Sequence, residues 1–147
     1  MTEILIINEA YPDRQKWIDF MNKEMKVRSF PDKIKGCVDI DHKEIEEYFT
    51  ALLKRNGLDI KIKRAWIHFM APKANHSAGH DHDVNVAVVY LQIPKDSGNL
   101  KLIDINRTII PEENMLVVIP RLAKHSMSTN NSDGMRLAMG FTFDTSN

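Results

Sequence analysis

Residues 135–143 read M-R-L-A-M-G-F-T-F, a run in which bulky and small side chains alternate. Successive side chains of a strand point to opposite faces of its sheet, so this run predicts a strand with two different faces. The bulky face is expected to pack against helices and comprises Met135, Leu137, Met139, Phe141 and Phe143. The small face is expected to leave a cavity beside one guanidinium and comprises Arg136, Ala138, Gly140 and Thr142.

Arg136 is the only charged side chain on the cavity-facing side of this run. A buried guanidinium needs an anionic partner to offset its desolvation, and its planar set of donors matches a carboxylate. Two interpretations follow: an internal salt bridge with Asp104 or Glu112, or a bound carboxylate ligand. The small neighbours on the same face favour the ligand.

The rest of the chain reads as helices followed by short strands. Residues 3–8 form an apolar run typical of a strand, and residues 14–25 carry apolar side chains at helical spacing. After a loop through residues 31–40, Asp41 and Glu44 form a capping box for a helix with the buried stripe 45–53, which Asn56-Gly57 ends. Turn residues then separate β-rich runs at 60–70, 84–93, 100–105, 108–110, 115–119 and 135–143. This order predicts a mainly β protein in which helices flank an antiparallel barrel.

Length and composition indicate one intracellular globular domain. A chain of 147 residues with 43% hydrophobic content can bury one sizeable core, so we expect a single domain over 1–147, with the flanking elements in 1–58 and the barrel in 59–147. Twenty basic and twenty acidic residues are interspersed, which gives no support for a nucleic-acid partner. Cys37 is the sole cysteine, which excludes an internal disulfide. No membrane span or secretory signal is evident, so a cytoplasmic protein is expected, with no readable oligomeric state.

The histidines suggest a metal site. His80 and His82 stand two residues apart in H-S-A-G-H-D-H-D (76–83), so in an extended chain both imidazoles reach one side and can bind one ion together. His125 can add a third imidazole and leave coordination positions open for substrate. A polar surface loop is the alternative interpretation of this segment. His42 is expected to be exposed, and His68 to line the core or the cavity.

Two longer stretches carry a family resemblance. Residues 89–100 read V-Y-L-Q-I-P-K-D-S-G-N-L, and residues 120–143 read P-R-L-A-K-H-S-M-S-T-N-N-S-D-G-M-R-L-A-M-G-F-T-F. Together with the upstream H-x-H they resemble the small, largely phage and bacterial group of iron(II)- and 2-oxoglutarate-dependent oxygenases. The resemblance covers about residues 76–143 and is most specific from Pro120 onward. It implies a double-stranded β-helix, a jelly-roll or cupin-like barrel.

The resemblance also implies site residues and a function. His80, His82 and His125 would bind Fe(II), and Arg136 would bind the far carboxylate of the cosubstrate 2-oxoglutarate. Asp81 or Asp83 could supply a carboxylate ligand in place of His82. The implied reaction is oxidative decarboxylation of 2-oxoglutarate coupled to hydroxylation of a substrate that the sequence does not define. The alternatives are a three-histidine cupin dioxygenase or isomerase that does not use 2-oxoglutarate, and a catalytically inactive binding module.

Overall fold

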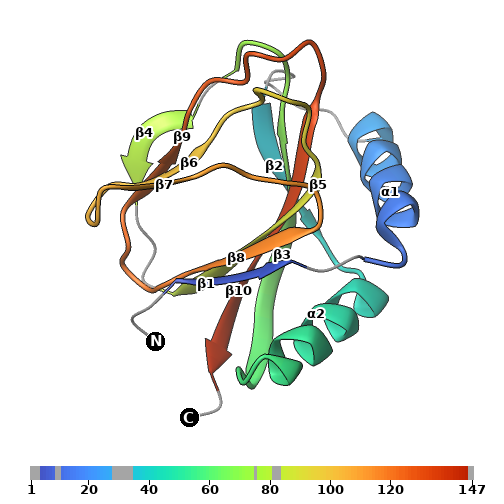
Figure 1. The fold of residues 1–147 in the computed structure, drawn as a ribbon. Coiled ribbons are helices and arrows are strands. Elements are labelled where there is room, and N and C mark those ends of the chain that lie inside the picture. Colours follow the sequence, from blue (N-terminus) through green and yellow to red (C-terminus); the bar gives the residue numbers. More distant parts are fainter. Residues whose placement is uncertain (1–3, 9–10, 28–34, 75, 81–83, 146–147) are drawn as a thin grey trace.

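The computed structural model describes residues 4–8, 11–27, 35–74, 76–80 and 84–145, with backbone alone at 26–27, 35–36 and 76–80. Two antiparallel sheets face each other, and two helices lie outside the larger sheet (Figure 1). The mainly β architecture with flanking helices that the sequence predicts is therefore confirmed. None of the helices in these ranges is long and apolar enough to cross a membrane.

The described ranges contain two helices and ten strands. The helices are α1 (Arg14–Val27) and α2 (Lys43–Arg55). The larger sheet has the strand order β1-β8-β5-β10-β3-β2. Its strands are β1 (Leu5–Asn8), β2 (Lys35–Ile40), β3 (Ile60–Met70), β5 (Asn85–Gln92), β8 (Met115–Ile119) and β10 (Arg136–Thr145). The smaller sheet has the order β4-β9-β6-β7. Its strands are β4 (His76–His80), β6 (Leu100–Leu102), β7 (Arg107–Ile109) and β9 (His125–Met127).

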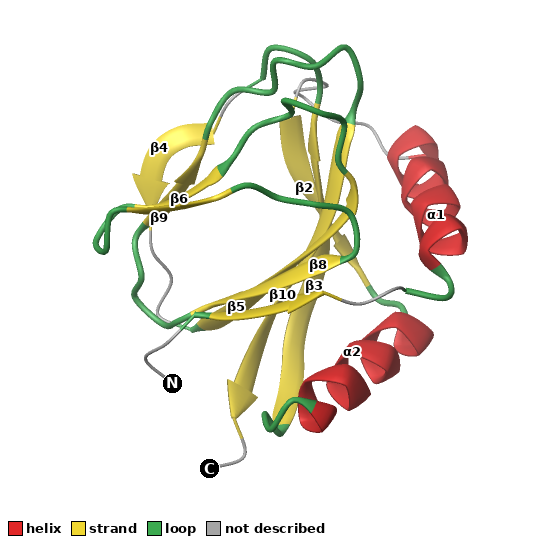
Figure 2. Ribbon diagram, viewed as in Figure 1, coloured by secondary structure: helices red, strands yellow, loops and turns green. Residues whose placement is uncertain are grey.

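The larger sheet separates two apolar layers. Figure 2 shows the helices, in red, on one side of this sheet and the smaller sheet on the other. Its outer face packs against both helices, where Trp17 and Phe49 meet Phe141 of β10 among the buried residues. Its inner face and the smaller sheet enclose a second cluster that includes Tyr90 and Val117. Each strand of the larger sheet therefore has an apolar side facing the helices and a second side available to line an interior space.

The alternation in residues 135–143 has the predicted effect on β10. Leu137, Met139, Phe141 and Phe143 lie in the cluster beneath the helices. The intervening side chains, from Arg136 to Thr142, face the space between the sheets. A period of two residues in one sequence segment thus decides which residues build the hydrophobic core and which are available for a site.

Helix α2 matches its predicted stripe and end, but its start differs from the prediction. Asn56 is the C-cap, and Gly57 follows with a φ of 86°. The N-cap is His42 and not Asp41, because the helix begins at Lys43 and the Nδ1 of His42 accepts from the Ile45 amide at 3.3 Å. His42 is partly buried, so the expectation that it is exposed is wrong.

Three short strands were not predicted. The sequence predicts a loop through 31–40, but residues 35–40 form the edge strand β2. Cys37 and Asp39 of this strand are exposed, while Val38 and Ile40 are buried. Strands β4 and β9 pair with each other in the smaller sheet. Strands β4 and β9 are too short, and have too few apolar residues, to show a hydrophobic period. Pairing with other strands therefore determines where they form.

Candidate functional site

The inner face of the larger sheet carries side chains in rows set by the strand register. Three paired positions of β10 define the rows: Ala138, Gly140 and Thr142. In the first row, Ala138 lies between Tyr90 on one side and His68 and then Cys37 on the other. In the second row, Gly140 lies between Val88 on one side and Trp66 and then Asp39 on the other. In the third row, Thr142 lies between Val86 and Arg64. Apart from Asp39, the residues of these rows line a cavity of about 320 Å³ between the two sheets. The smaller sheet contributes Leu100, His125 and Met127 to the same cavity.

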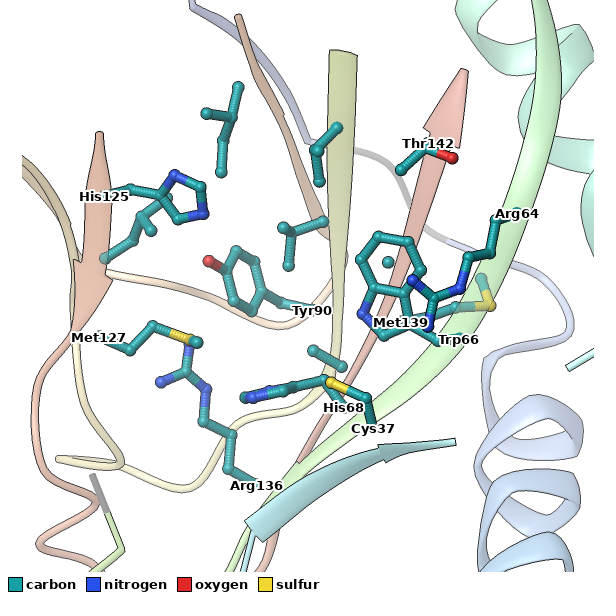
Figure 3. A pocket seen from close by; sticks show the side chains of 16 residues that line it. Cys37, Arg64, Trp66, His68, Tyr90, His125, Met127, Arg136, Met139 and Thr142 are labelled. Carbon is teal, nitrogen blue, oxygen red and sulfur yellow. The ribbon is translucent and has the colours of Figure 1, made fainter. Parts of the chain in front are cut away.

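Arg136 lies at one end of this cavity and is fully buried (Figure 3). Its Nη1 donates to the Ser97 carbonyl oxygen at 3.4 Å, and its Cζ lies 5.3 Å from the centre of the Tyr90 ring. Its Nε and Nη2 have no hydrogen-bond partner among the described residues. The guanidinium is therefore buried, and two of its nitrogens can still donate hydrogen bonds to a ligand.

The internal salt bridge considered for Arg136 does not form with either candidate acid. Asp104 is exposed, and its carboxylate accepts from the Lys124 amide at 3.1 Å. Glu112 is also exposed. Among the described residues, no carboxylate pairs with Arg136, so the carboxylate-ligand interpretation is the one that the geometry supports.

Tyr90 adds a third unsatisfied group beside the guanidinium. Its side chain is fully buried, and its hydroxyl has no hydrogen-bond partner among the described residues. Burial raises the pKa of this phenol, while the nearby charge of Arg136 acts in the opposite direction. Burial also lowers the pKa of Arg136, and Tyr90 opposes that change. At neutral pH the Tyr90 hydroxyl is neutral and the Arg136 guanidinium is positively charged, and both can donate hydrogen bonds to an anion.

A turn before β6 supports the guanidinium. Gly98 has a φ of 111°, and a Cβ added there would lie 2.5 Å from the Ser128 carbonyl oxygen and 3.0 Å from Nη1 of Arg136. Glycine is needed for both the backbone conformation and the close approach. Tyr90, Ser97 and Gly98 all belong to the motif of residues 89–100, but the motif alone does not predict their contact with Arg136. The Ser-Gly pair between two predicted strands was the available signal.

His125 projects from β9 into the same cavity and is 5% exposed. Its Nδ1 lies 3.0 Å from the Ala123 carbonyl oxygen. A carbonyl oxygen can only accept, so Nδ1 carries the hydrogen, and in the neutral ring Nε2 holds the lone pair. Metal-binding histidines commonly have this arrangement, in which one ring nitrogen donates to a carbonyl and the other is available as a ligand.

The backbone brings the upstream histidine segment to His125. Strand β4 pairs with β9 so that His80 lies directly opposite His125. His82 lies outside the described residues, as do Asp81 and Asp83. Among the side chains that the structure describes, no three histidine, cysteine, aspartate or glutamate residues form a cluster able to hold a metal. The predicted ligand set of residues 80, 82 and 125 therefore stays a prediction.

His68 lines the cavity, as one of the two expectations for it stated. It projects from β3 in the row that also contains Tyr90 and Cys37. Figure 3 shows its imidazole in the part of the cavity that contains Arg136, with Trp66 and Arg64 further along β3. Met70, the last residue of that strand, is buried outside the cavity lining.

Comparison with known proteins identifies the fold. No family model and no curated protein sequence matches the chain. A viral collagen prolyl hydroxylase from Paramecium Bursaria Chlorella virus-1, solved with 2-oxoglutarate, matches at a TM-score of 0.68 and 11% identity over 95% of this chain and 94% of that one. A prolyl-4-hydroxylase from Pseudomonas putida matches at 0.66 and 18%, over 97% and 92% of the two chains. HygX from Streptomyces hygroscopicus, with nickel and 2-oxoglutarate bound, matches at 0.69 and 10%, over 99% and 83%.

The structural matches span nearly the whole chain. The protein therefore has the double-stranded β-helix fold found in iron(II)- and 2-oxoglutarate-dependent oxygenases, and the fold implied by the sequence resemblance is confirmed. At these low identities the likeness concerns the fold, and function has to be argued from the site itself.

Proposed function

We propose that the protein is an iron(II)- and 2-oxoglutarate-dependent oxygenase that couples oxidative decarboxylation of 2-oxoglutarate to hydroxylation of a second substrate. The observation that carries the proposal is Arg136, a fully buried cation in a cavity with two nitrogens that lack a partner among the described residues. One carboxylate of a dicarboxylate ligand supplies both the negative charge and the hydrogen-bond acceptors that the guanidinium lacks.

Arg136 and Tyr90 would hold the end of 2-oxoglutarate that does not react. The guanidinium would donate to the far carboxylate through Nε and Nη2, and the Tyr90 hydroxyl would give a further hydrogen bond. Because the raised pKa keeps Tyr90 protonated, the hydroxyl remains a donor over the physiological range. The Ser97 carbonyl and Gly98 keep the guanidinium in place before the ligand arrives, which reduces the entropy lost on binding.

His125, His80 and His82 would bind the iron. The Nδ1 contact with the Ala123 carbonyl directs Nε2 of His125 for coordination, and the pairing of β4 with β9 supports a ligand contributed by His80. Asp81 or Asp83 remains an alternative to His82 as the third ligand. Bound iron would supply the activation of dioxygen, and the protein supplies orientation and a cavity wall of mostly apolar side chains that limits access of water.

A three-histidine cupin enzyme without a keto-acid cosubstrate explains the site less well. Such an enzyme could use the same imidazoles, but it would leave the buried guanidinium of Arg136 without a counterion among the residues that the structure describes. An unpaired buried charge is costly and is seldom retained unless it serves binding or catalysis. The same argument applies to a module with only a structural role.

The proposal is tested by anaerobic titration with Fe(II) and then 2-oxoglutarate, followed by the visible metal-to-ligand charge-transfer band of the complex. The native chain should develop the band and His125→Ala should not. His42→Ala is the matched control, because it removes a histidine that caps α2 rather than one that lines the cavity. His68→Asn tests the other cavity histidine and should keep the band. An unaltered band in His125→Ala would refute the assignment of the metal site.

A further inference from the structure

The cavity has a second end that Arg136 does not reach. Gly140 lies four residues further along β10, which corresponds to roughly 14 Å at the usual rise of a strand. The five-carbon chain of 2-oxoglutarate spans far less than four residues of extended backbone. If the guanidinium holds 2-oxoglutarate as in the proposed function, on which this inference rests, the space beyond Gly140 is left for another molecule.

This outer end is defined by Trp66, Val86, Val88, Ile119 and Thr142, and its walls are mainly apolar. Val86 and Ile119 are buried, and Val88 and Trp66 are partly buried. All five line the cavity. The hydroxyl of Thr142 and the indole N–H of Trp66 are the only polar side-chain groups among these five residues.

The indole of Trp66 is held in position by its neighbours. A Cβ added to Gly140 would lie 2.5 Å from two ring carbons of Trp66, so the absence of a side chain at 140 makes room for the indole. The Cζ of Arg64 lies 5.2 Å from the centre of the indole ring, and Nε of Arg64 bonds an oxygen of Asp39 at 2.7 Å. Figure 3 shows Trp66 and Arg64 together at the end of the cavity away from His125.

The charges at this end lie at its solvent-facing rim. Arg64 and Asp39 are both exposed and form an ion pair there, so neither charge lies among the apolar side chains of the outer end. A charged substrate group placed among the valines, Ile119 and Trp66 would lose its hydration without gaining a partner, which is strongly unfavourable. A neutral apolar group would instead gain free energy from its removal from water, and an aromatic ring would also gain from packing on the indole.

We propose that the outer end binds an uncharged, ring-sized apolar group of the primary substrate, and that Trp66 is the residue that selects it. The group would pack against the indole and the valine side chains. Polar or charged parts of the same substrate would remain at the solvent-facing rim near Arg64. Sugars and ionic groups would be excluded from this part of the cavity.

Tryptophan fluorescence offers a direct test, because the chain has only two tryptophans. Trp17 is buried in the core beneath the helices, so Trp17→Phe leaves Trp66 as the sole reporter. Benzyl alcohol is the neutral probe, with benzylammonium and a hexose as charged and polar comparators. Calorimetric titration of the unsubstituted protein with the same probes reports binding independently of emission. We expect a saturable response to benzyl alcohol and at least tenfold weaker binding of both comparators.

Two substitutions of nearly equal shape alter the polarity of the outer end in opposite directions. Val88→Thr adds a hydroxyl, and it should weaken benzyl alcohol binding by roughly three- to tenfold. Thr142→Val removes one, and it should strengthen binding by a similar factor. Equal binding of the hexose, no saturable response to benzyl alcohol, or the same affinity in both variants would overturn the inference.

Measurements with 2-oxoglutarate separate this inference from the proposed function. Benzyl alcohol and 2-oxoglutarate should bind together without competition, because they occupy different ends of the cavity. Competition between them would overturn the two-ended arrangement. If benzyl alcohol binds as expected while 2-oxoglutarate does not bind at all, the apolar site stands and the oxygenase proposal fails.

Discussion

Replacing Arg136 by methionine should make the protein more stable and at the same time poor at binding 2-oxoglutarate. The side chain is fully buried, and it has one long hydrogen bond and two nitrogens without a partner among the described residues. A hydrogen bond contributes about 1 kcal/mol, and each unmet buried donor costs about 1–3 kcal/mol. Apolar replacement of buried charged groups is accordingly neutral to stabilising by about 1–4 kcal/mol. Denaturant unfolding without ligand measures this gain.

The binding loss follows from the same contacts. Removing one member of a buried, hydrogen-bonded charge pair costs about 2–5 kcal/mol, which corresponds to a roughly 30- to 4,000-fold rise in Kd. Anaerobic calorimetry with Fe(II) and 2-oxoglutarate measures that change. The native protein should also be stabilised against unfolding by 2-oxoglutarate, whereas Arg136→Met should not.

Arg64→Met provides the control for loss of a cation from the same cavity. Arg64 is exposed and paired with Asp39, so its replacement should change stability by less than about 1 kcal/mol and leave the Kd for 2-oxoglutarate unchanged. The reasoning is refuted if Arg136→Met destabilises the protein while its affinity for 2-oxoglutarate remains that of the native chain. That result would assign the guanidinium a structural role.

Three further predictions concern the residues that shape the cavity. Gly140→Ala should destabilise the protein by about 1–3 kcal/mol in denaturant unfolding, because the new Cβ overlaps the indole of Trp66; unchanged stability would mean that the indole moves freely. Asn130→Ala should lower the free energy of unfolding by about 2–4 kcal/mol, because the buried amide donates to the carbonyls of residues 70 and 134 and accepts from residue 132. As the control, Asn131→Ala at an exposed position should lower it by less than about 0.5 kcal/mol in the same assay. Although Cys37 is exposed, the surrounding protein partly desolvates its thiol and raises the pKa, so its alkylation rate should reach half its maximum at a higher pH than that of the unfolded chain. Equal midpoints would contradict this.

Much of the fold could be predicted because its signals are local. The helical spacing in residues 14–25, the Asn56-Gly57 stop and the β-rich runs each depend on neighbours in sequence, and strands β3 and β8 have the predicted bounds. Strands β2, β4 and β9 could not be predicted in this way. They have few apolar residues of their own, and pairing with distant strands stabilises them.

Some residues of the candidate site can be predicted from local sequence, and others cannot. The inward position of Arg136 follows from the period of β10, and His125 was recognisable from the spacing of the final motif. Tyr90 and Trp66 could equally have been core residues, since buried aromatic side chains at strand spacing occur in both settings. Only the register that places them opposite residues 138 and 140 brings them to the cavity.

The sequence alone determined which side of β10 is apolar, that a guanidinium lies on its small face, and where the helices begin and end to within a few residues. Tertiary structure decided that Arg136 has no acidic partner among the described residues and that His80 lies opposite His125. The physical reason is that side-chain periodicity is encoded between neighbours along the chain. Ion pairing and strand register, in contrast, depend on residues tens of positions apart that meet only when the sheets close.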